Sequence, residues 1–150
     1  MMEILEILGF VVTIISLIIA FWQYSLYKRQ MRIEQLSKYS ARFCKNSSTI
    51  ALAKYLNSAD DGKLTDKEKI PDNYDIEIFM RYFEELELLI RAKSIDEKLV
   101  SYMYSHYIIK FDDLKTKWSK VKYSSDKWKI FRELVSRMRR IKEDKTNYNI

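Results

Sequence analysis

The feature that most constrains this chain is a run of 21 consecutive uncharged residues, positions 7–27, near its amino terminus. A helix rises about 1.5 Å per residue, so this run would cover roughly 31 Å, about the thickness of the hydrocarbon core of a bilayer. The basic residues Lys28, Arg29 and Arg32 follow at once. We therefore predict a transmembrane helix, and the rest of the chain must fold as a unit attached to a membrane.

The charges on the two sides of the run predict its orientation. No Lys or Arg precedes it, whereas six lie between positions 28 and 45. By the positive-inside rule the amino terminus would be outside and the carboxyl-terminal part cytoplasmic, as in a single-pass protein of a bacterial inner membrane. A cleaved secretory signal would need a basic amino-terminal region, which is missing. The residues expected at the cytoplasmic interface are Trp22, Tyr24, Tyr27, Lys28, Arg29 and Arg32.

One face of the predicted span is small or polar along its whole length. Small residues at spacings of three and four let helices approach closely in lipid, and hydroxyls or amides on the same face can bond across the contact. This pattern favours self-association into a homo-oligomer. In a ring of copies the same face could line a pore, although Thr and Ser can also simply bond back to their own helix. The face consists of Gly9, Thr13, Ser16, Ala20 and Gln23.

Charge is distributed unevenly over the remaining residues. Positions 28–54 carry a net charge of +6, positions 55–97 carry −6, and positions 98–150 carry +8. A basic segment beside an anionic leaflet is expected. The basic carboxyl-terminal part could instead meet the acidic middle of the same or a neighbouring subunit, lie along the membrane, or bind RNA.

The composition predicts an all-α fold, because two Gly and one Pro leave few tight turns for a sheet. We expect one N-terminal transmembrane helix that extends into the cytoplasm and is followed by a small helical bundle. The expected divisions are an anchor at 1–28, a juxtamembrane helix at 29–57, a loop at 58–73, a cytoplasmic helical bundle at 74–145 and a tail at 146–150.

Three helices are expected within the bundle. The first runs from about Tyr74 to Lys93, with Asp72 or Asn73 as its cap, and the second opens with a capping box from Ser94 to Glu97. The second helix could reach Trp118, and a break at positions 123–126 precedes the third. The inner face of that last helix is expected to contain Trp128, Phe131, Val135 and Met138.

Aromatic residues are numerous in the bundle, and their helical spacing indicates packing. This expectation covers Tyr74, Phe79, Tyr82, Phe83, Tyr102, Tyr104, Tyr107 and Phe111. Stacking on single-stranded nucleic acid would need rings exposed among basic residues, and only Trp118, Tyr123 and Trp128 meet that condition. The corresponding candidate patch for RNA or a protein partner contains Lys115, Lys117, Lys120, Lys122, Lys129, Arg132, Arg139 and Arg140.

No catalytic pattern is recognisable, so we expect a protein that is not an enzyme and has no cofactor. His106 is the only histidine and Cys44 the only cysteine, which leaves no Cys and His zinc site. Small helical bundles of the HEPN ribonucleases carry an Arg followed after a short spacer by a His. Here Arg91 is the nearest Arg before His106, and the spacing is far too long. The carboxylates Glu84, Glu85 and Glu87 are expected on a solvated face.

The segment from Phe79 to Phe111, FMRYFEELELLIRAKSIDEKLVSYMYSHYIIKF, resembles a pattern in small bacterial membrane-anchored proteins of unknown function. The resemblance covers about a fifth of the chain and implies a fold rather than an activity. The layout of one amino-terminal span and a small basic helical domain is also similar to the membrane accessory proteins of type VI-B CRISPR systems. That similarity implies a multimeric pore that assists an RNA-guided effector protein.

Two hypotheses of function follow. In the first, the chain self-associates in the lipid bilayer and forms an oligomeric pore or another membrane-perturbing effector, in bacterial antiphage defence of the CRISPR type. In the second, the span is a passive tether and the basic carboxyl-terminal helices bind RNA or a protein partner as an adaptor. The subunit number and any gating signal are not encoded in a recognisable way.

Overall fold

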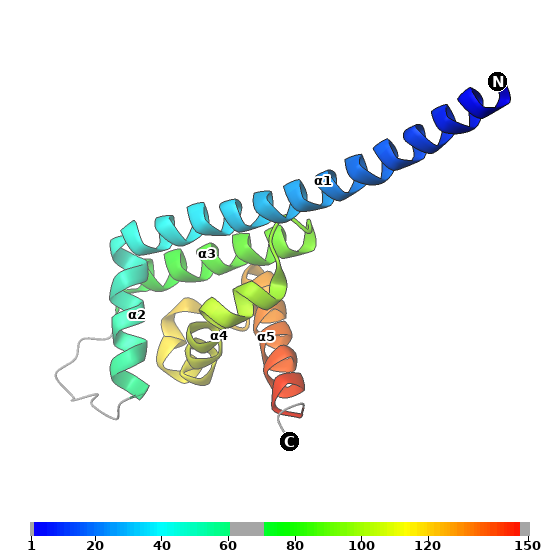
Figure 1. The fold of residues 1–150 in the computed structure, drawn as a ribbon. Helices are drawn as coiled ribbons and strands as arrows, with labels where there is room; N and C mark the ends of the chain where they lie inside the picture. The colour runs from blue at the N-terminus through cyan, green and yellow to red at the C-terminus, as the bar shows by residue number, and fades with distance from the viewer. Residues whose placement is uncertain (1, 61–70, 148–150) are drawn as a thin grey trace.

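The computed structural model describes residues 2–60 and 71–147, and within these ranges all regular elements are helical. A single long helix, α1 (Met2–Lys45), projects from a bundle formed by α2 (Ser47–Asp60), α3 (Asn73–Arg91), α4 (Glu97–Asp113) and α5 (Lys129–Asn147). Two 3₁₀ segments, η1 (Lys115–Val121) and η2 (Asp126–Trp128), join α4 to α5. The predicted fold class, an extended amino-terminal helix followed by a helical bundle, is confirmed (Figure 1).

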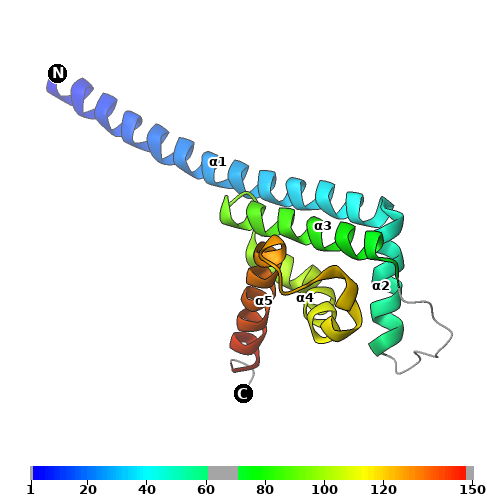
Figure 2. The same ribbon diagram turned by 180° about the vertical axis from the view of Figure 1, so that it is seen from behind.

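Helix α1 extends well beyond the bundle in both views (Figures 1 and 2). Its 44 residues correspond to about 66 Å, roughly twice the thickness of a hydrocarbon core. Only its carboxyl-terminal part, where Leu36, Tyr39 and Phe43 are buried, contacts the bundle. The same helix can therefore cross a membrane and still carry the domain.

The expectation of one juxtamembrane helix through position 57 is wrong, because the chain turns at Asn46. The Asn46 Oδ1 atom accepts the backbone N–H groups of Ser48 (3.0 Å) and Thr49 (3.2 Å), which caps α2. The buried Thr49 hydroxyl donates to the carbonyl of Phe43 (2.6 Å) and holds the two helices together at the corner. The chain thus changes direction at an Asn cap, and the corner contains neither Gly nor Pro.

Helix α3 runs antiparallel to the end of α1, since Tyr82 contacts Tyr39 whereas the earlier Phe79 contacts the later Phe43. Asp72 caps α3 by accepting the N–H of Asp75 (2.9 Å), which confirms one of the two predicted caps. The expected loop at 58–73 begins later than predicted, because α2 continues to Asp60; positions 61–70 lie outside the described residues.

The predicted capping box from Ser94 to Glu97 is wrong, because a different residue caps α4 in the turn after α3. Asp96, and not Ser94, caps α4, with its Oδ1 accepting the N–H groups of Lys98 (2.8 Å) and Leu99 (3.2 Å). Ser94 instead closes the end of α3, where its N–H bonds to the carbonyl of Leu89 (3.0 Å). Lys93 takes the left-handed conformation (φ 55°) that this type of helix end requires.

Helix α4 ends at Asp113 rather than reaching Trp118, which lies in η1. The chain reverses near Lys122, in a left-handed conformation, so the predicted break before the last helix is confirmed. Most of the predicted inner positions of the bundle are buried, including the whole expected face of the last helix. Tyr74 and Tyr102 are exceptions, since they are 69% and 83% exposed and do not pack in the core as expected.

Candidate functional site

The described side chains in the amino-terminal half of α1 do not pack against the rest of the protein. The described side chains between positions 7 and 31 are all exposed, and the most apolar window of the helix has a mean hydropathy of 1.8 with none of its residues buried. It is the one helix among the described residues that is long and apolar enough to cross a membrane. An apolar surface of this extent is expected to be covered by lipid or by another copy of the chain.

The small and polar residues of the span, Gly9, Thr13, Ser16, Ala20 and Gln23, form an exposed stripe that we call the polar stripe. Apart from its chain neighbours and the backbone of its own helix, no atom lies within 4 Å of the Cβ position at Gly9, so the helix surface is open there. The hydroxyls of Thr13 and Ser16 donate to the carbonyls of Gly9 and Val12, each at 2.8 Å. Their protons are thus used within the helix, and each oxygen still has a free lone pair to accept a bond from another molecule.

The polar stripe and the domain lie on nearly opposite faces of α1. Successive residues of a helix are about 100° apart, so the stripe is centred roughly 150° away from the face formed by Leu36, Tyr39 and Phe43. Those three residues are buried against the bundle. A second helix could therefore contact the stripe without displacing the domain.

The predicted interfacial residues lie on α1 where its uncharged run ends. Trp22, Tyr24 and Tyr27 are exposed, as rings at a headgroup layer would be in the absence of lipid. The Lys28 ammonium lies 4.8 Å from the centre of the Tyr24 ring, a cation–π contact that places the first charge beside the last aromatic residues. Arg29 is exposed and Arg32 is partly buried at the start of the contact with the domain.

Paired tyrosines fix the domain to α1. The Tyr82 hydroxyl donates to the carbonyl of Tyr39 (2.8 Å), and the Tyr39 hydroxyl donates to the carbonyl of Tyr82. Burial raises the pKa of both phenols above the usual range. Arg42 adds an ion pair with Glu85, and Phe43 contacts several aromatic rings of the core. Because these contacts come from two helices that lie side by side (Figure 1), the domain is held rigidly against the end of α1.

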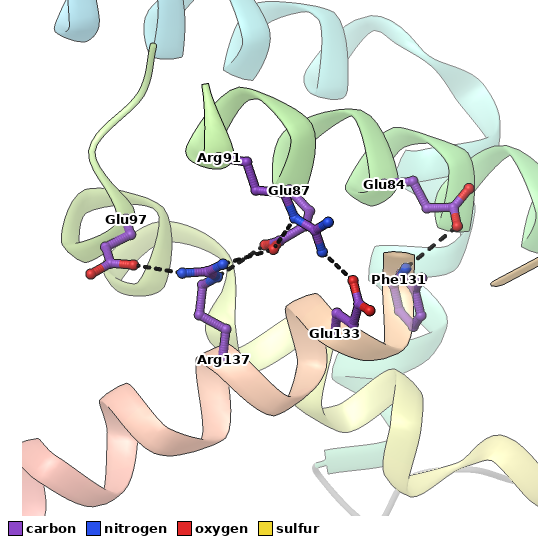
Figure 3. A network of polar contacts seen from close by, with 7 residues as sticks. All are labelled: Glu84, Glu87, Arg91, Glu97, Phe131, Glu133 and Arg137. Atoms are coloured by element: carbon purple, nitrogen blue, oxygen red, sulfur yellow. Dashed lines mark hydrogen bonds and ion pairs between the residues drawn. The ribbon is translucent and has the colours of Figure 1, made fainter. Parts of the chain in front are cut away.

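A buried carboxylate joins three helices of the bundle (Figure 3). Glu87 on α3 has a fully buried side chain that accepts the Arg137 Nη2 and Nε atoms from α5 (2.9 and 3.1 Å) and Arg91 Nε (3.0 Å). Arg137 also reaches Glu97 on α4 (3.1 Å). The expectation of a solvated acidic face is wrong at Glu87. Its partner Arg91 is only four positions away, but Arg137 is 50 positions away and could not be identified from local sequence.

The prediction that Trp118, Tyr123 and Trp128 are exposed for base stacking is wrong for both tryptophans. Trp118 and Trp128 are each 1% exposed, and their indole N–H groups donate to the carbonyls of Phe111 (2.9 Å) and Val121 (3.3 Å). Tyr123 is partly buried and donates its hydroxyl to Asp112 (2.7 Å), while burial raises the pKa of this phenol above the usual range. These rings form the core between α4 and α5 and present no platform for bases.

The predicted basic patch contains arginines that are bonded within the domain as well as exposed side chains. Arg132 donates to the carbonyls of Tyr123 (2.8 Å) and Ser125 (2.7 Å), so it ties the η1 to η2 connection to α5. Arg139 donates to Asp112 and Asp113, both at 2.7 Å, and these hydrogen bonds raise its pKa. The members with exposed side chains are Lys115, Lys117, Lys122, Lys129 and Arg140, and the side chain of Lys120 lies outside the described residues.

Within the described residues, no three His, Cys, Asp or Glu side chains are arranged to hold a metal ion. His106 is exposed, and its ring lies 5.5 Å from that of Tyr107. No family model, curated protein or solved structure matches this chain. Its function must therefore be argued from its own residues.

Proposed function

We propose that this protein is a single-pass membrane protein, with its amino terminus outside and its helical domain in the cytoplasm, that self-associates through the polar stripe. Its output would be an oligomeric pore or another disturbance of the bilayer. The observation that supports this best is the position of the stripe, which is exposed along the span and lies on the side of α1 opposite the domain.

Close approach of helices in lipid depends on small side chains, because lipid tails are as apolar as Leu and provide no hydrophobic driving force between helices. Gly9 and Ala20 allow that approach near the two ends of the stripe. Thr13, Ser16 and Gln23 supply polar atoms at the same contact. In a cyclic arrangement the stripes would face the axis and the domains would lie around the outside.

A pore requires that water reach the stripe. Polar side chains within a membrane usually face a protein interior or a water-filled cavity. Thr13, Ser16 and Gln23 would line such a cavity, whereas Lys28 and Arg29 lie on other faces of α1 and would set the orientation of the span. The resemblance in layout to the CRISPR accessory proteins suggests antiphage defence in a bacterial inner membrane, which a phage challenge of expressing and non-expressing cells would test.

The alternative function, a tether whose basic helices bind RNA or a protein partner, has less support. Two of its candidate arginines, Arg132 and Arg139, are committed to internal hydrogen bonds. Its tryptophans are buried. What remains is Arg140 and a set of exposed lysines, which would give weak binding with strong salt dependence.

The test compares the full chain with two double variants in detergent and in liposomes. Thr13→Leu with Ser16→Leu adds bulk to the stripe, whereas Val11→Phe with Ile18→Phe adds bulk to the opposite, equally exposed face and is the control. We expect the stripe variant to insert normally but to lose self-association by roughly tenfold, the factor that about 1.4 kcal/mol of lost contact corresponds to. Ion leak should fall with it, and the control should retain both.

Particle mass and ion leak separate the two parts of the proposal. An unmodified chain that is monomeric in detergent and in bilayers would refute self-association. A defined oligomer without leak would keep self-association and refute the pore. A control variant that is as impaired as the stripe variant would show that the contact does not use the polar stripe.

A further inference from the structure

A basic cleft lies where the domain meets the end of the membrane span. It is formed between α1 and the beginning of α4 and has a volume of about 750 Å³. Its cationic walls are Lys28, Arg29 and Arg32 on α1 and Lys98 on α4. The turn that joins α3 to α4 lies beside α1 in both views (Figures 1 and 2), so the cleft belongs to the end of the domain that faces the membrane.

The charge of the cleft is strongly unbalanced. Four cations face one carboxylate, Asp96, and that carboxylate is already used to cap α4 through the N–H groups of Lys98 and Leu99. Within the described part of the chain, no ion pair engages the side chains of Arg29, Arg32 or Lys98. Cations gathered without counter-charges repel one another, so an anion that enters the cleft would be stabilised by all of them.

The position along α1 identifies the source of the anion. Tyr27 is the last uncharged residue of the span and Lys28 is the first charge after it, so the cleft begins at the level of the lipid headgroups. Tyr102, which is 83% exposed, borders the cleft. A phenol of this kind is stable at an interface, where the ring meets acyl chains and the hydroxyl meets water.

We propose that this cleft binds the headgroup phosphate of an anionic phospholipid in the cytoplasmic leaflet. Arg32 and Lys98 contact the phosphate from two different helices, and Tyr102 packs against the glycerol and upper acyl region. The inference rests on the membrane anchoring of the proposed function and is independent of self-association. Lys98 is the informative residue, because a Lys on α4 has no part in setting the orientation of the span.

A general attraction to an anionic leaflet is the competing explanation. In that case each Lys or Arg near the surface adds a similar binding free energy whatever its position, which corresponds to roughly a fivefold change in affinity. Lys93, at the tip of the turn between α3 and α4, is exposed at the same end of the domain but does not line this cleft. Replacing Lys93 by Gln removes the same charge as replacing Lys98 by Gln, and so it is the matched control.

The experiment measures lipids retained by the full-length protein in native mass spectrometry after exchange into mixed micelles with phosphatidylglycerol or phosphatidylcholine. We expect the unmodified chain to retain one phosphatidylglycerol per protomer in preference to phosphatidylcholine. Lys98→Gln should weaken that retention roughly fivefold, and Arg32→Gln with Lys98→Gln about 25-fold, if the two contributions add. Lys93→Gln should retain phosphatidylglycerol to within about twofold of the unmodified chain, because the Lys93 side chain does not contact the bound lipid.

Incorporation into nanodiscs of pure phosphatidylcholine shows in parallel that each variant still inserts, so a failure of anchoring is distinguished from a failure of headgroup binding. Equal retention of the two lipids would refute the proposal, as would equal losses in Lys93→Gln and Lys98→Gln. Complete competition by millimolar inorganic phosphate would show a site for free phosphate and would also overturn the assignment to lipid.

Discussion

The buried Glu87 carboxylate provides the sharpest test of what holds the domain together. We consider the replacement of Glu87 by Gln, which keeps the shape of the side chain and removes its charge. In the structure this carboxylate is fully buried and receives three hydrogen bonds, two from Arg137 and one from Arg91. Gln has one acceptor oxygen and presents an NH₂ group to guanidinium donors, so the variant leaves at least one of these contacts unmade.

The magnitude follows from the surroundings of the two arginines. Removing one partner of a buried ion pair costs about 3–5 kcal/mol, because the remaining charge is left without compensation. The side chains of Arg137 and Arg91 are 28% and 43% exposed, and they retain ion pairs with Glu97 and Glu133 respectively. Partial solvation and these second partners reduce the penalty, so we expect a loss of about 3 kcal/mol, at the lower end of the range.

Glu85 supplies the matched control two positions away on the same helix. It also pairs with an arginine, Arg42, but the Glu85 side chain is 48% exposed and that of Arg42 is 54% exposed. Exposed ion pairs contribute about 0–1 kcal/mol, so Glu85→Gln should cost less than about 1 kcal/mol. The two variants remove the same charge from the same helix and differ in burial.

Urea unfolding of the full chain in detergent measures both effects, and urea is preferred to guanidinium because it does not screen charges. Trp118 and Trp128 are buried in the bundle, so their fluorescence reports unfolding of the domain. With a slope of about 2 kcal/mol per M, the midpoint of Glu87→Gln should fall by about 1.5 M. If Glu87→Gln and Glu85→Gln lose equal amounts, the buried network does not stabilise the three-helix junction and the reasoning fails.

Two further predictions concern pH. Burial raises the pKa of Glu84, which accepts the Phe131 N–H. A carboxyl group whose pKa is raised by folding stabilises the fold at low pH, and this stability is lost as pH rises through the folded pKa. Glu84→Gln should therefore be more stable than the unmodified chain at neutral pH. This difference in stability should shrink toward about pH 4. Burial likewise raises the pKa of the Tyr39 and Tyr82 phenols, whose contribution is complete below about pH 10 and is lost as pH rises further. Replacing both by Phe should flatten the alkaline decline in the unfolding midpoint, although each loss of a hydrogen bond lowers the midpoint at neutral pH.

Periodicity alone predicted much of the fold. The spacing of apolar residues located α3, α4 and α5. The four residues expected on the inner face of the last helix are all buried, although Trp128 lies in η2 just before α5. Asp72 was a predictable cap because an acidic residue preceded an apolar helical pattern. These features depend on local sequence, and local sequence is what such patterns describe.

The incorrect predictions concern residues whose environment depends on contacts with distant parts of the chain. Asn46 opens a short Asn-Ser-Ser-Thr run without Gly or Pro; its side chain caps α2, and the buried Thr49 bonds back to Phe43 at the corner. Glu87 belongs to an acidic run, and its burial depends on Arg137, which is 50 positions away. Trp118 and Trp128 stand among lysines in the sequence, but the described lysine side chains are exposed while the rings enter the core.

The arrangement of faces on α1 connects the anchor with the rest of the molecule. Leu36, Tyr39 and Phe43 bind the domain on one side, and the reciprocal bonds between Tyr39 and Tyr82 leave it little freedom to rotate about the helix. A rotation of the span in the membrane would therefore carry the domain with it. In an assembly joined through the polar stripe, the domains would be fixed at the outside, with the basic cleft of each copy turned toward the surrounding lipid. The contact between spans and the proposed lipid site would thus be compatible in a single particle, because they use opposite sides of one continuous helix.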